Sequence, residues 1–313
     1  MLNLRKCAVI GAGAVGATTA FTLLGSGLFS ELVLLDINRD KAWGEAMDIS
    51  HSVPFMRPAN VYSGGYEDLK DCGIVVITAG AAQEPGETRI DLVRKNVKIF
   101  QSIVPRIVAH NREAILLVVA NPVDILTYVT LKLSGFPAAR VIGSGTVLDT
   151  ARLKYLLGQE LTVDPRNIHA FIIGEHGDTE LPVWSSANVS GIDLGDFWDL
   201  CGKSPARADE IFQEVRTSGY KMIETKGATN YAISRAVLRI AEAILRDENS
   251  VLPVSGLADG HYGLRDLCLG LPAIVGREGI KRILDFPLDE GERAALQKSA
   301  DTLREVLAGI ELD

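Results

Sequence analysis

The sequence predicts an α/β protein in which a doubly wound parallel sheet is followed by a mixed α+β domain. Strand and helix patterns alternate up to Gly145, a glycine-rich turn joins the first strand to the first helix, and longer helical patterns follow beyond Gly145. At 313 residues the chain exceeds the size at which single cores stop growing. We therefore expect two domains, residues 1–145 for a dinucleotide and residues 146–313 for a substrate.

Composition excludes several classes of protein. The chain is 47% hydrophobic and 23% charged, and its net charge of −8 shows no runs of one sign, so nucleic acid is not an expected partner. No apolar run reaches the ~18 residues of a membrane span and the N-terminus lacks room for a signal peptide, so we expect no membrane association and a cytoplasmic protein. The four cysteines form no C-x-x-C pair, which fits reduced thiols better than disulfides or zinc.

Three glycines in one turn predict a nucleotide site. Gly11, Gly13 and Gly16 follow a short apolar strand at residues 6–10 and precede a helix of small residues at 17–28. Gly11 allows the tight turn, Gly13 lets the backbone approach a pyrophosphate, and Gly16 lets helix and strand pack closely. The helix N-terminus then faces the phosphates. In this strand–turn–helix context the G-x-G-x-x-G pattern predicts a Rossmann-type dinucleotide site.

Asp36 selects the cofactor. It ends a β-rich run at residues 31–35 and lies 20 residues after Gly16. A carboxylate at this position accepts hydrogen bonds from a ribose 2′-hydroxyl and repels a 2′-phosphate. The sequence therefore predicts NAD rather than NADP.

The alternation then continues, and we expect a parallel sheet with right-handed crossovers. Its further strands and helices are predicted at residues 73–79, 92–111, 115–120, 123–133 and 140–142. Ligands bind such sheets at the carboxyl ends of strands, so Gly80, Ala81 and Asn121, each just past a strand, should face the site. A simple turn is the alternative at Asn121.

Beyond Gly145 the helical patterns cover residues 148–157, 205–225, 228–246 and 290–308. Between them, residues 251–257 and 270–275 are typical of strands, which we expect to be antiparallel.

The polar segment at residues 80–89 suits a lid. It contains a Pro-Gly pair and leaves a strand end where the cofactor should lie. Its closure would carry Gln83 and Arg89 over a bound substrate, where a guanidinium polarises a carbonyl. A solvated surface loop is the alternative.

Three residues have the chemistry of proton transfer to a keto acid. Asp149 and Arg152 share one face of a helix, as a local ion pair or as parts of a cleft. In a cleft, Arg152 clamps a carboxylate with two hydrogen bonds, and Asp149 holds the imidazole of His176 and favours its charged form. A histidine paired with a carboxylate supplies a proton near neutral pH. His176, within residues 174–178, could also ligate a metal, but no second histidine lies at ligand spacing, so no metal is expected.

In order and spacing, these motifs resemble the L-lactate dehydrogenases within the lactate and malate dehydrogenase superfamily. The resemblance also includes residues 121–124 and 227–229, and it extends over essentially the whole chain. It implies that His176 is the acid/base, Asp149 its partner, Arg152 the carboxylate clamp and Arg89 the lid arginine. Substrate-pocket positions are Gln83, Asn121 and Thr229. Positions that touch the cofactor are Gly11, Gly13, Val15, Gly16, Asp36, Lys41, Tyr66, Gly80, Ala81 and Asn121.

The implied reaction is hydride transfer from reduced nicotinamide to pyruvate, with its reverse oxidising L-lactate. The malate branch has an arginine where this chain has Gln83, and a neutral Gln83 would leave a second carboxylate unpaired in a dry site. We therefore expect pyruvate over oxaloacetate. Bulkier 2-keto acids, as in a 2-hydroxyisocaproate dehydrogenase, and a non-catalytic NAD-binding protein on the same fold are the alternatives.

Two further positions match the site at which some bacterial members of this family bind a regulatory ligand. Bacterial allosteric members bind fructose 1,6-bisphosphate between subunits through positions occupied here by Lys154 and His169. The first is usually arginine, and lysine offers a point charge in place of a bidentate fork. We hypothesise activation by the sugar bisphosphate, and the resemblance implies a homotetramer.

Overall fold

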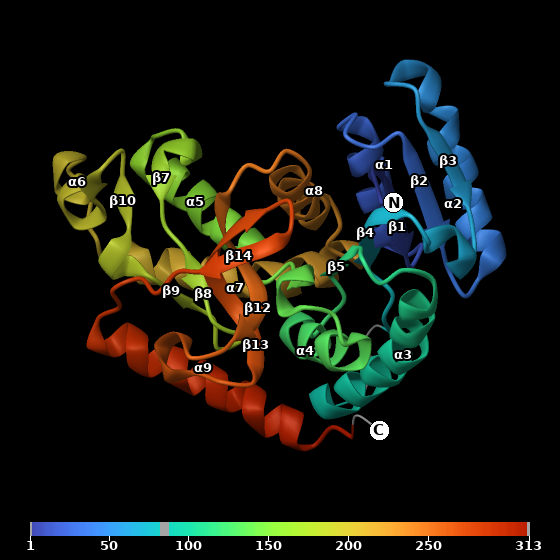
Figure 1. The fold of residues 1–313 in the computed structure, drawn as a ribbon. Coiled ribbons are helices and arrows are strands. Elements are labelled where there is room, and N and C mark those ends of the chain that lie inside the picture. Colours follow the sequence, from blue (N-terminus) through green and yellow to red (C-terminus); the bar gives the residue numbers. More distant parts are fainter. Residues whose placement is uncertain (1, 82–87, 312–313) are drawn as a thin grey trace.

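A nine-stranded sheet forms the centre of the computed structural model, which describes residues 2–81 and 88–311. Its strand order is β14-β13-β12-β6-β5-β4-β1-β2-β3, and helices cover both faces (Figure 1). The α/β fold predicted from the sequence is confirmed.

The first six strands are parallel. They are β1 (Asn3–Ile10), β2 (Glu31–Leu35), β3 (Asn60–Ser63), β4 (Cys72–Ile77), β5 (Ile115–Val118) and β6 (Val141–Gly143). The chain runs outward from β1 to β3 and then returns to β4 on the other side of β1, so the strand order reverses between β1 and β4. Ligands bind doubly wound sheets at such a reversal. Ile10 pairs with both Leu35 and Ile77, so the carboxyl ends of β1, β2 and β4 lie side by side.

The crossover helices of this half are α1 (Ala14–Gly25), α2 (Arg39–His51), α3 (Arg89–His110) and α4 (Val123–Ser134). Sequence reasoning left residues 39–63 unassigned, and they form α2, a short 3-10 turn and β3. Asn38 caps the N-terminus of α2, where its side chain accepts a hydrogen bond from the backbone N–H of Lys41. Strand β4 is buried at every residue, as expected for a strand covered on both faces.

Three antiparallel strands extend the same sheet. They are β12 (Ser250–Ala258), β13 (Leu267–Gly276) and β14 (Gly279–Ile283), and the antiparallel pairing predicted for residues 251–257 and 270–275 is confirmed. Strand β12 joins β6 through Ser255 opposite Gly143. Sequence reasoning did not predict that these strands continue the first sheet, because strand pairing over a hundred residues leaves no local pattern.

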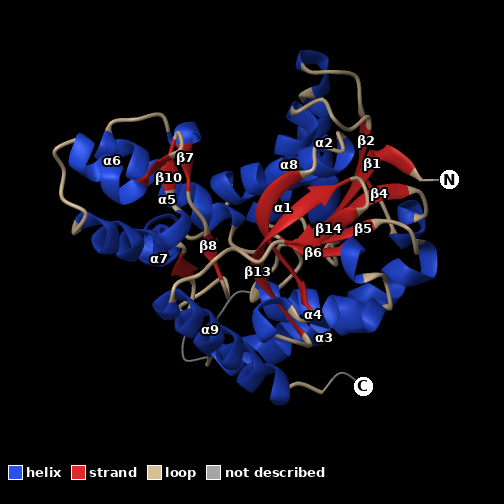
Figure 2. Cartoon of the chain, turned by 60° about the vertical axis from the view of Figure 1, so that its left-hand side comes forward, coloured by secondary structure: helices blue, strands red, loops and turns tan. Residues whose placement is uncertain are grey.

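The remaining helices are α5 (Val147–Leu161), α6 (Leu194–Leu200), α7 (Arg207–Lys226), α8 (Tyr231–Leu245) and α9 (Glu290–Ala308). Short strands β7 (Ile168–His169), β10 (Asn188–Val189) and β11 (Ile192–Asp193) form one small sheet, and β8 (Ile172–Ile173) and β9 (Leu181–Pro182) form another. The β7-β10 sheet and α6 lie on the opposite side of the molecule from β1 to β3 (Figure 1 and Figure 2).

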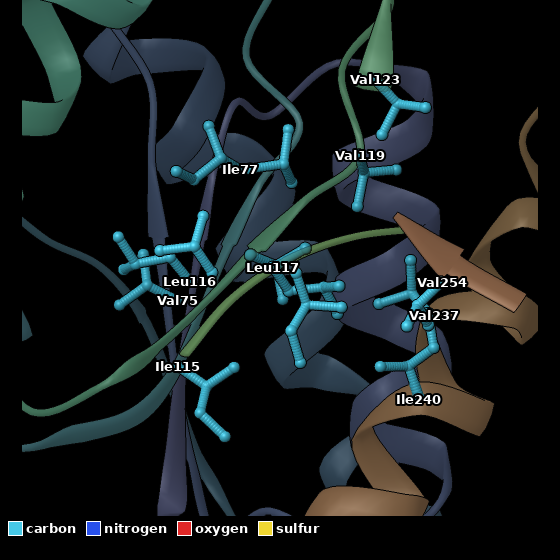
Figure 3. Packing of buried hydrophobic residues seen from close by; sticks show 14 of the residues in the cluster. Val75, Ile77, Ile115, Leu116, Leu117, Val119, Val123, Val237, Ile240 and Val254 are labelled. Carbon is cyan, nitrogen blue, oxygen red and sulfur yellow. The ribbon is translucent and has the colours of Figure 1, made fainter. Parts of the chain in front are cut away.

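One large core joins the two halves. Figure 3 shows Leu117 of β5 on the side of Val237 and Ile240 of α8 and Val254 of β12, while Leu116 lies beside Val75 of β4, and all of them are buried in a single cluster. A second cluster, centred on Trp198, packs α5, α6 and α7 against the β7-β10 sheet. Burial of this extent supplies most of the stability of such folds. Within the described ranges, no helix combines the length and apolarity needed to cross a membrane.

Candidate active site

The glycine turn after β1 has two crowded positions and one open position. Gly11 has φ +104°, and a Cβ on it would lie 2.6 Å from the backbone nitrogen of Ala79. A Cβ on Gly16 would lie 1.7 Å from the carbonyl oxygen of Gly11. At Gly13, in contrast, no atom of the described residues lies within 4 Å of the place that a Cβ would take, so its outer side is open among them. The turn therefore packs tightly against β4 and leaves backbone exposed at Gly13.

A cleft of about 770 Å³ lies over this turn. Its lining includes seven positions predicted to touch the cofactor, which are Gly11, Gly13, Asp36, Lys41, Tyr66, Gly80 and Ala81. The Asp36 carboxylate accepts hydrogen bonds from the backbone N–H groups of Ala12, at 2.7 Å, and Asn38, at 2.8 Å. These bonds fix the carboxylate at the end of β2, within the cleft.

A buried asparagine joins two of the loops at the sheet edge. The side-chain oxygen of Asn96 on α3 accepts from the backbone N–H of Ala81 at 2.7 Å, and its Nδ2 donates to the carbonyl of Asn121 at 2.8 Å. Asn96 is 1% exposed. Sequence reasoning missed it, although a polar residue on the apolar face of the predicted helix at 92–111 was an available signal.

A chain of three side chains forms the chemical centre. The Nδ1 of His176 lies 2.6 Å from Oδ2 of Asp149, and Nη1 of Arg152 donates to Oδ1 of the same carboxylate at 2.9 Å. Asp149 is buried in the first turn of α5, and Arg152 follows it by one helical turn. The three predicted residues therefore meet at one carboxylate.

Burial and neighbouring charges shift the pKa values of His176 and Asp149 in opposite directions. Burial by itself lowers the pKa of His176, but the Asp149 carboxylate outweighs burial and raises the pKa to about 9. Burial likewise raises the pKa of Asp149, but His176 and Arg152 outweigh it and hold that pKa below its ordinary value. The pair is therefore an imidazolium and a carboxylate near neutral pH.

A second aspartate holds the backbone of His176. The Oδ2 of Asp124, at the start of α4, accepts from the backbone N–H of His176 at 2.7 Å, and its Oδ1 accepts from the Ser255 hydroxyl at 2.6 Å. Burial raises the pKa of Asp124 to about 6 despite these two bonds. The loop that carries His176 is thus anchored on α4 and β12. Sequence reasoning assigned no role to Asp124 and did not consider Ser255.

The acidic neighbours of His176 in sequence bond elsewhere. The Thr179 hydroxyl donates to the Glu175 carboxylate, and the backbone N–H of Glu175 donates to Ser299 Oγ of α9 at 2.7 Å. The Tyr220 hydroxyl of α7 donates to Asp178 at 3.2 Å. Glu175 and Asp178 therefore tie the loop that carries His176 to α9 and α7.

A cavity of about 310 Å³ opens beside this chain. Its lining includes six predicted positions, which are Val15, Asn121, Asp149, Arg152, His176 and Thr229. It also includes Glu180, which sequence reasoning missed and which is 6% exposed. Burial and the nearby Asp149 raise the pKa of Glu180 to about 8, and its Oε1 has no hydrogen-bond partner within the described part of the chain.

Comparison with known proteins agrees with this geometry. The model of the lactate/malate dehydrogenase NAD binding domain matches residues 5–143, and that of the lactate/malate dehydrogenase alpha/beta C-terminal domain matches residues 146–311. The chain belongs to the lactate/malate dehydrogenase family. Its relatives include an L-lactate dehydrogenase of Acetivibrio thermocellus, 53% identical over 99% of this chain and 98% of the relative. The L-lactate dehydrogenase of Thermoanaerobacterium saccharolyticum is 52% identical over 99% of this chain and 100% of its own length.

Solved structures of the family have the same fold over nearly the whole chain. A minor L-lactate dehydrogenase from Enterococcus mundtii, in a ligand-bound form, aligns with a TM-score of 0.96 and 39% identity over 99% of each chain. A lactate dehydrogenase from a deep-sea metagenome library aligns with a TM-score of 0.95 and 44% identity, over 98% of this chain and 99% of that one.

Two predicted side chains fall outside the described part of the chain, and two others lie away from the two cavities. Gln83 falls outside the described residues, as does the side chain of Arg89, whose backbone begins α3 directly after the N-cap Thr88. Lys154 is half-buried on α5, where burial lowers its pKa, and His169 is exposed on β7. Neither residue lines the cavities described above.

A metal ion is a poor fit to the acidic cluster. Asp149, His176 and Glu180 offer ligand atoms within 4.8 Å of one another. However, the first two already bond to each other, and the Arg152 guanidinium lies against Asp149. A cation would have to displace a proton and face a fixed positive charge, so the arrangement suits proton transfer better than metal binding.

Proposed function

We propose that this chain is an NAD-dependent L-lactate dehydrogenase that interconverts pyruvate and L-lactate. The observation that carries the proposal is that Arg152, Asp149 and His176 bond to one another and line one cavity, at the carboxyl ends of β5 and β6. L-lactate dehydrogenases that are more than half identical over at least 97% of this chain support the same activity.

The cleft over the glycine turn fits NAD. The N-terminus of α1 has no side-chain cap and no acidic residue in its first turn, so its free N–H groups are available to phosphate oxygens. Gly13 presents open backbone, and the Asp36 carboxylate suits ribose hydroxyls. We assign the cofactor to residues 1–145 and the substrate to residues 146–313. Bound NADH would supply the hydride for the carbonyl carbon.

His176 and Arg152 divide the work on the substrate. Because Nδ1 of His176 is held by Asp149, the other ring nitrogen, Nε2, is left to give its proton to the carbonyl oxygen. Nε of Arg152 is buried and lacks a hydrogen-bond partner among residues 2–81 and 88–311. A buried, unpaired guanidinium N–H is costly, and the carboxylate of a 2-keto acid would satisfy it. In the reverse direction, neutral His176 takes the proton of the lactate hydroxyl.

Residues of the lid and the pocket are proposed to discriminate between pyruvate and oxaloacetate. We assign Arg89 to polarisation of the carbonyl, and we assign Gln83, Asn121 and Thr229 to the pocket. A neutral Gln83 disfavours oxaloacetate, because burying its second carboxylate without a partner costs several kcal/mol, against about 1.4 kcal/mol per tenfold of discrimination.

The test uses purified protein with NADH and either pyruvate or oxaloacetate, followed by NADH absorbance. Turnover of pyruvate, faster than that of oxaloacetate and lost in His176→Gln, is the expected result. Faster turnover of oxaloacetate would favour the malate branch. NADH binding without turnover of either acid would favour a non-catalytic NAD-binding protein.

We also propose regulation by fructose 1,6-bisphosphate at Lys154 and His169 in a cytoplasmic homotetramer. Lys154 lies two residues after Arg152 on α5, so a phosphate bound there acts on the helix that carries the carboxylate clamp. Lys154 is half-buried and has no acidic partner in the described structure, so its ammonium group would be stabilised by a bound anion. Activity at low pyruvate that does not change as the sugar bisphosphate is added would contradict activation. Light scattering measures the oligomeric state.

A further inference from the structure

Glu180 is a buried acid in the substrate cavity that the proposed proton transfer does not use. It is the last residue before β9, in the loop from β8 that also carries His176 (Figure 1). Its side chain lines the cavity and is 6% exposed. Within the described part of the chain, Oε1 has no hydrogen-bond partner, and no ion pair joins the carboxyl to Arg152 or Arg216. A buried polar atom without a partner is costly, so its place in a cavity indicates a partner that arrives with the ligand.

Charged groups face Glu180 from three elements. Asp149 and Arg152 act on its carboxyl from α5. His176 acts on it from the same loop, and Arg216 acts on it from α7. Ligand atoms of Asp149, His176 and Glu180 lie within 4.8 Å of one another, whereas Arg216 is exposed and its charge is screened by solvent. Burial and the Asp149 carboxylate outweigh the cations and raise the pKa of Glu180 to about 8.

The other titratable side chains of the cavity have partners. Asp149 bonds His176 and Arg152, as described above. The Tyr220 hydroxyl of α7 donates to Asp178. Among the described side chains that line this cavity, Glu180 is therefore the acid that is left to respond to a ligand.

The charge of the cavity changes when a 2-keto acid binds. Arg152 and protonated His176 are positive and the Asp149 carboxylate is negative, so the carboxylate of a substrate brings the sum of these buried charges to zero. An ionised Glu180 would add a further negative charge to the same cavity. Like charges a few ångströms apart in a buried site disfavour each other's ionised forms. The bound substrate therefore favours the protonated form of Glu180.

The hydrogen-bonding capacity of Glu180 favours the same form. An ionised carboxylate only accepts hydrogen bonds, as do the carboxylate and the carbonyl of a 2-keto acid. A protonated carboxyl has one O–H donor, and a substrate oxygen in the cavity is an acceptor for it. Protonation therefore removes a repulsion between like charges and gives the unpartnered carboxyl a partner in the ligand.

Resting on the proposed function, we infer that Glu180 takes up one proton from solvent as the anionic substrate enters the cavity. The enzyme then binds 2-keto acids more tightly at lower pH, through a residue that does not itself protonate the substrate. Below about pH 8 the proton is already in place, and above that pH binding of the anion requires a proton to be taken up. His176 adds a separate loss of binding as pH rises through about 9.

The experiment compares the wild type with Glu180→Gln and with a control, Asp178→Asn, each saturated with NADH. Glutamine has nearly the size of glutamic acid and keeps an N–H donor at every pH. Asp178 lies in the same loop but does not line the cavity. The ligand is oxamate, an unreactive isostere of pyruvate. Calorimetry in two buffers of different ionisation enthalpy measures the Kd of oxamate and the number of protons taken up, and Tm is measured near pH 8 without oxamate.

At about pH 8 the wild type should take up about half a proton or more per oxamate bound, and Glu180→Gln should take up about a tenth. Between about pH 6.5 and about pH 9, the affinity of the wild type should fall by about tenfold or more, and that of Glu180→Gln by about two- to threefold. Asp178→Asn should match the wild type in both. The Tm of Glu180→Gln should equal or exceed that of the wild type, because glutamine does not have to gain a proton on folding.

Equal proton uptake by the wild type and Glu180→Gln would overturn the inference. So would weak binding of oxamate by Glu180→Gln at every pH, a Tm of this variant below that of the wild type, or an equal loss of proton uptake in Asp178→Asn. A wild type that neither binds oxamate at about pH 6.5 nor reduces any 2-keto acid would instead refute the proposed function.

Discussion

Asp149 Oδ2 lies 2.6 Å from Nδ1 of His176, across 27 residues of sequence. The carboxylate is buried and also bonds Arg152, so it is a fixed negative charge beside the imidazole. This single contact orients the ring and favours its protonated form. The predictions below depend on it and on the groups that hold it in place.

Replacing Asp149 with asparagine should lower kcat for pyruvate by about a hundredfold or more, because general acid catalysis by an oriented imidazole is worth about 10² to 10⁴. The pKa of His176 should fall with it. Asp178→Asn is the comparison, since Asp178 bonds Tyr220, and its kcat should change only a few-fold. A larger loss in Asp178→Asn than in Asp149→Asn would undo the assignment. Steady-state kinetics measure both.

Pyruvate reduction should decline as pH rises through about 9, because it requires protonated His176, whose pKa is raised to about 9. Lactate oxidation requires the neutral ring and should rise over the same range. Since the folded-state pKa lies above the ordinary value of 6.5, the ion pair stabilises the fold fully below that pH, and its contribution is lost as pH rises through about 9.

Profiles of kcat/KM against pH, for pyruvate reduction and for lactate oxidation, measure these two pH dependences. Asp149, Asp124 and Glu180 face the ring, so Glu180→Gln is the control for the second titrating group. The alkaline decline should persist in Glu180→Gln. Its disappearance there would assign the decline to Glu180.

Arg152→Gln should raise KM for pyruvate and lower kcat/KM by about a hundredfold, since hydrogen bonds to charged groups are worth about 1.5–3 kcal/mol each. Binding of oxamate, an unreactive isostere of pyruvate, should weaken by a similar factor. Affinity for NADH should stay within a few-fold, because Arg152 lies outside the cofactor cleft. A kcat/KM within a few-fold of wild type would exclude Arg152 as the carboxylate clamp.

Ser299→Ala should destabilise the protein and misplace the catalytic loop. The Ser299 hydroxyl accepts the backbone N–H of Glu175, and its loss leaves a buried donor unpaired at a cost of about 1–3 kcal/mol. Tm should fall by several degrees, and kcat should fall with it. Ser299→Thr keeps the hydroxyl and should recover most of both. Thermal unfolding measures Tm and steady-state kinetics measure kcat. Unchanged values of both in Ser299→Ala would show that α9 does not support the loop.

Asp36→Ser should weaken NADH binding and improve the use of NADPH, because it removes a negative charge from the ribose end of the cleft. We expect the ratio of kcat/KM for NADPH over NADH to rise by about one to two orders of magnitude. The wild type should strongly prefer NADH. Equal use of both cofactors by the wild type would remove Asp36 as the selecting residue.

The sequence by itself determined the features that are local. The glycine turn, Asp36 at the end of β2, and Asp149 with Arg152 on one helix face each depend on neighbours within a few residues or on one strand–helix unit. Turn chemistry and helical periodicity are short-range, so they can be predicted from a short window. The antiparallel strands were predicted for the same reason, but their place in the sheet was not.

Only the tertiary structure decided how distant segments support one another. It joined β12 to β6, brought Asp124 and Ser255 to the backbone of His176, and buried Asn96 between two loops. It also placed Glu180 in the cavity wall. Hydrogen bonds and packing between segments that are distant in the sequence depend on the position of each element in space, and a single sequence shows no periodicity that encodes such positions.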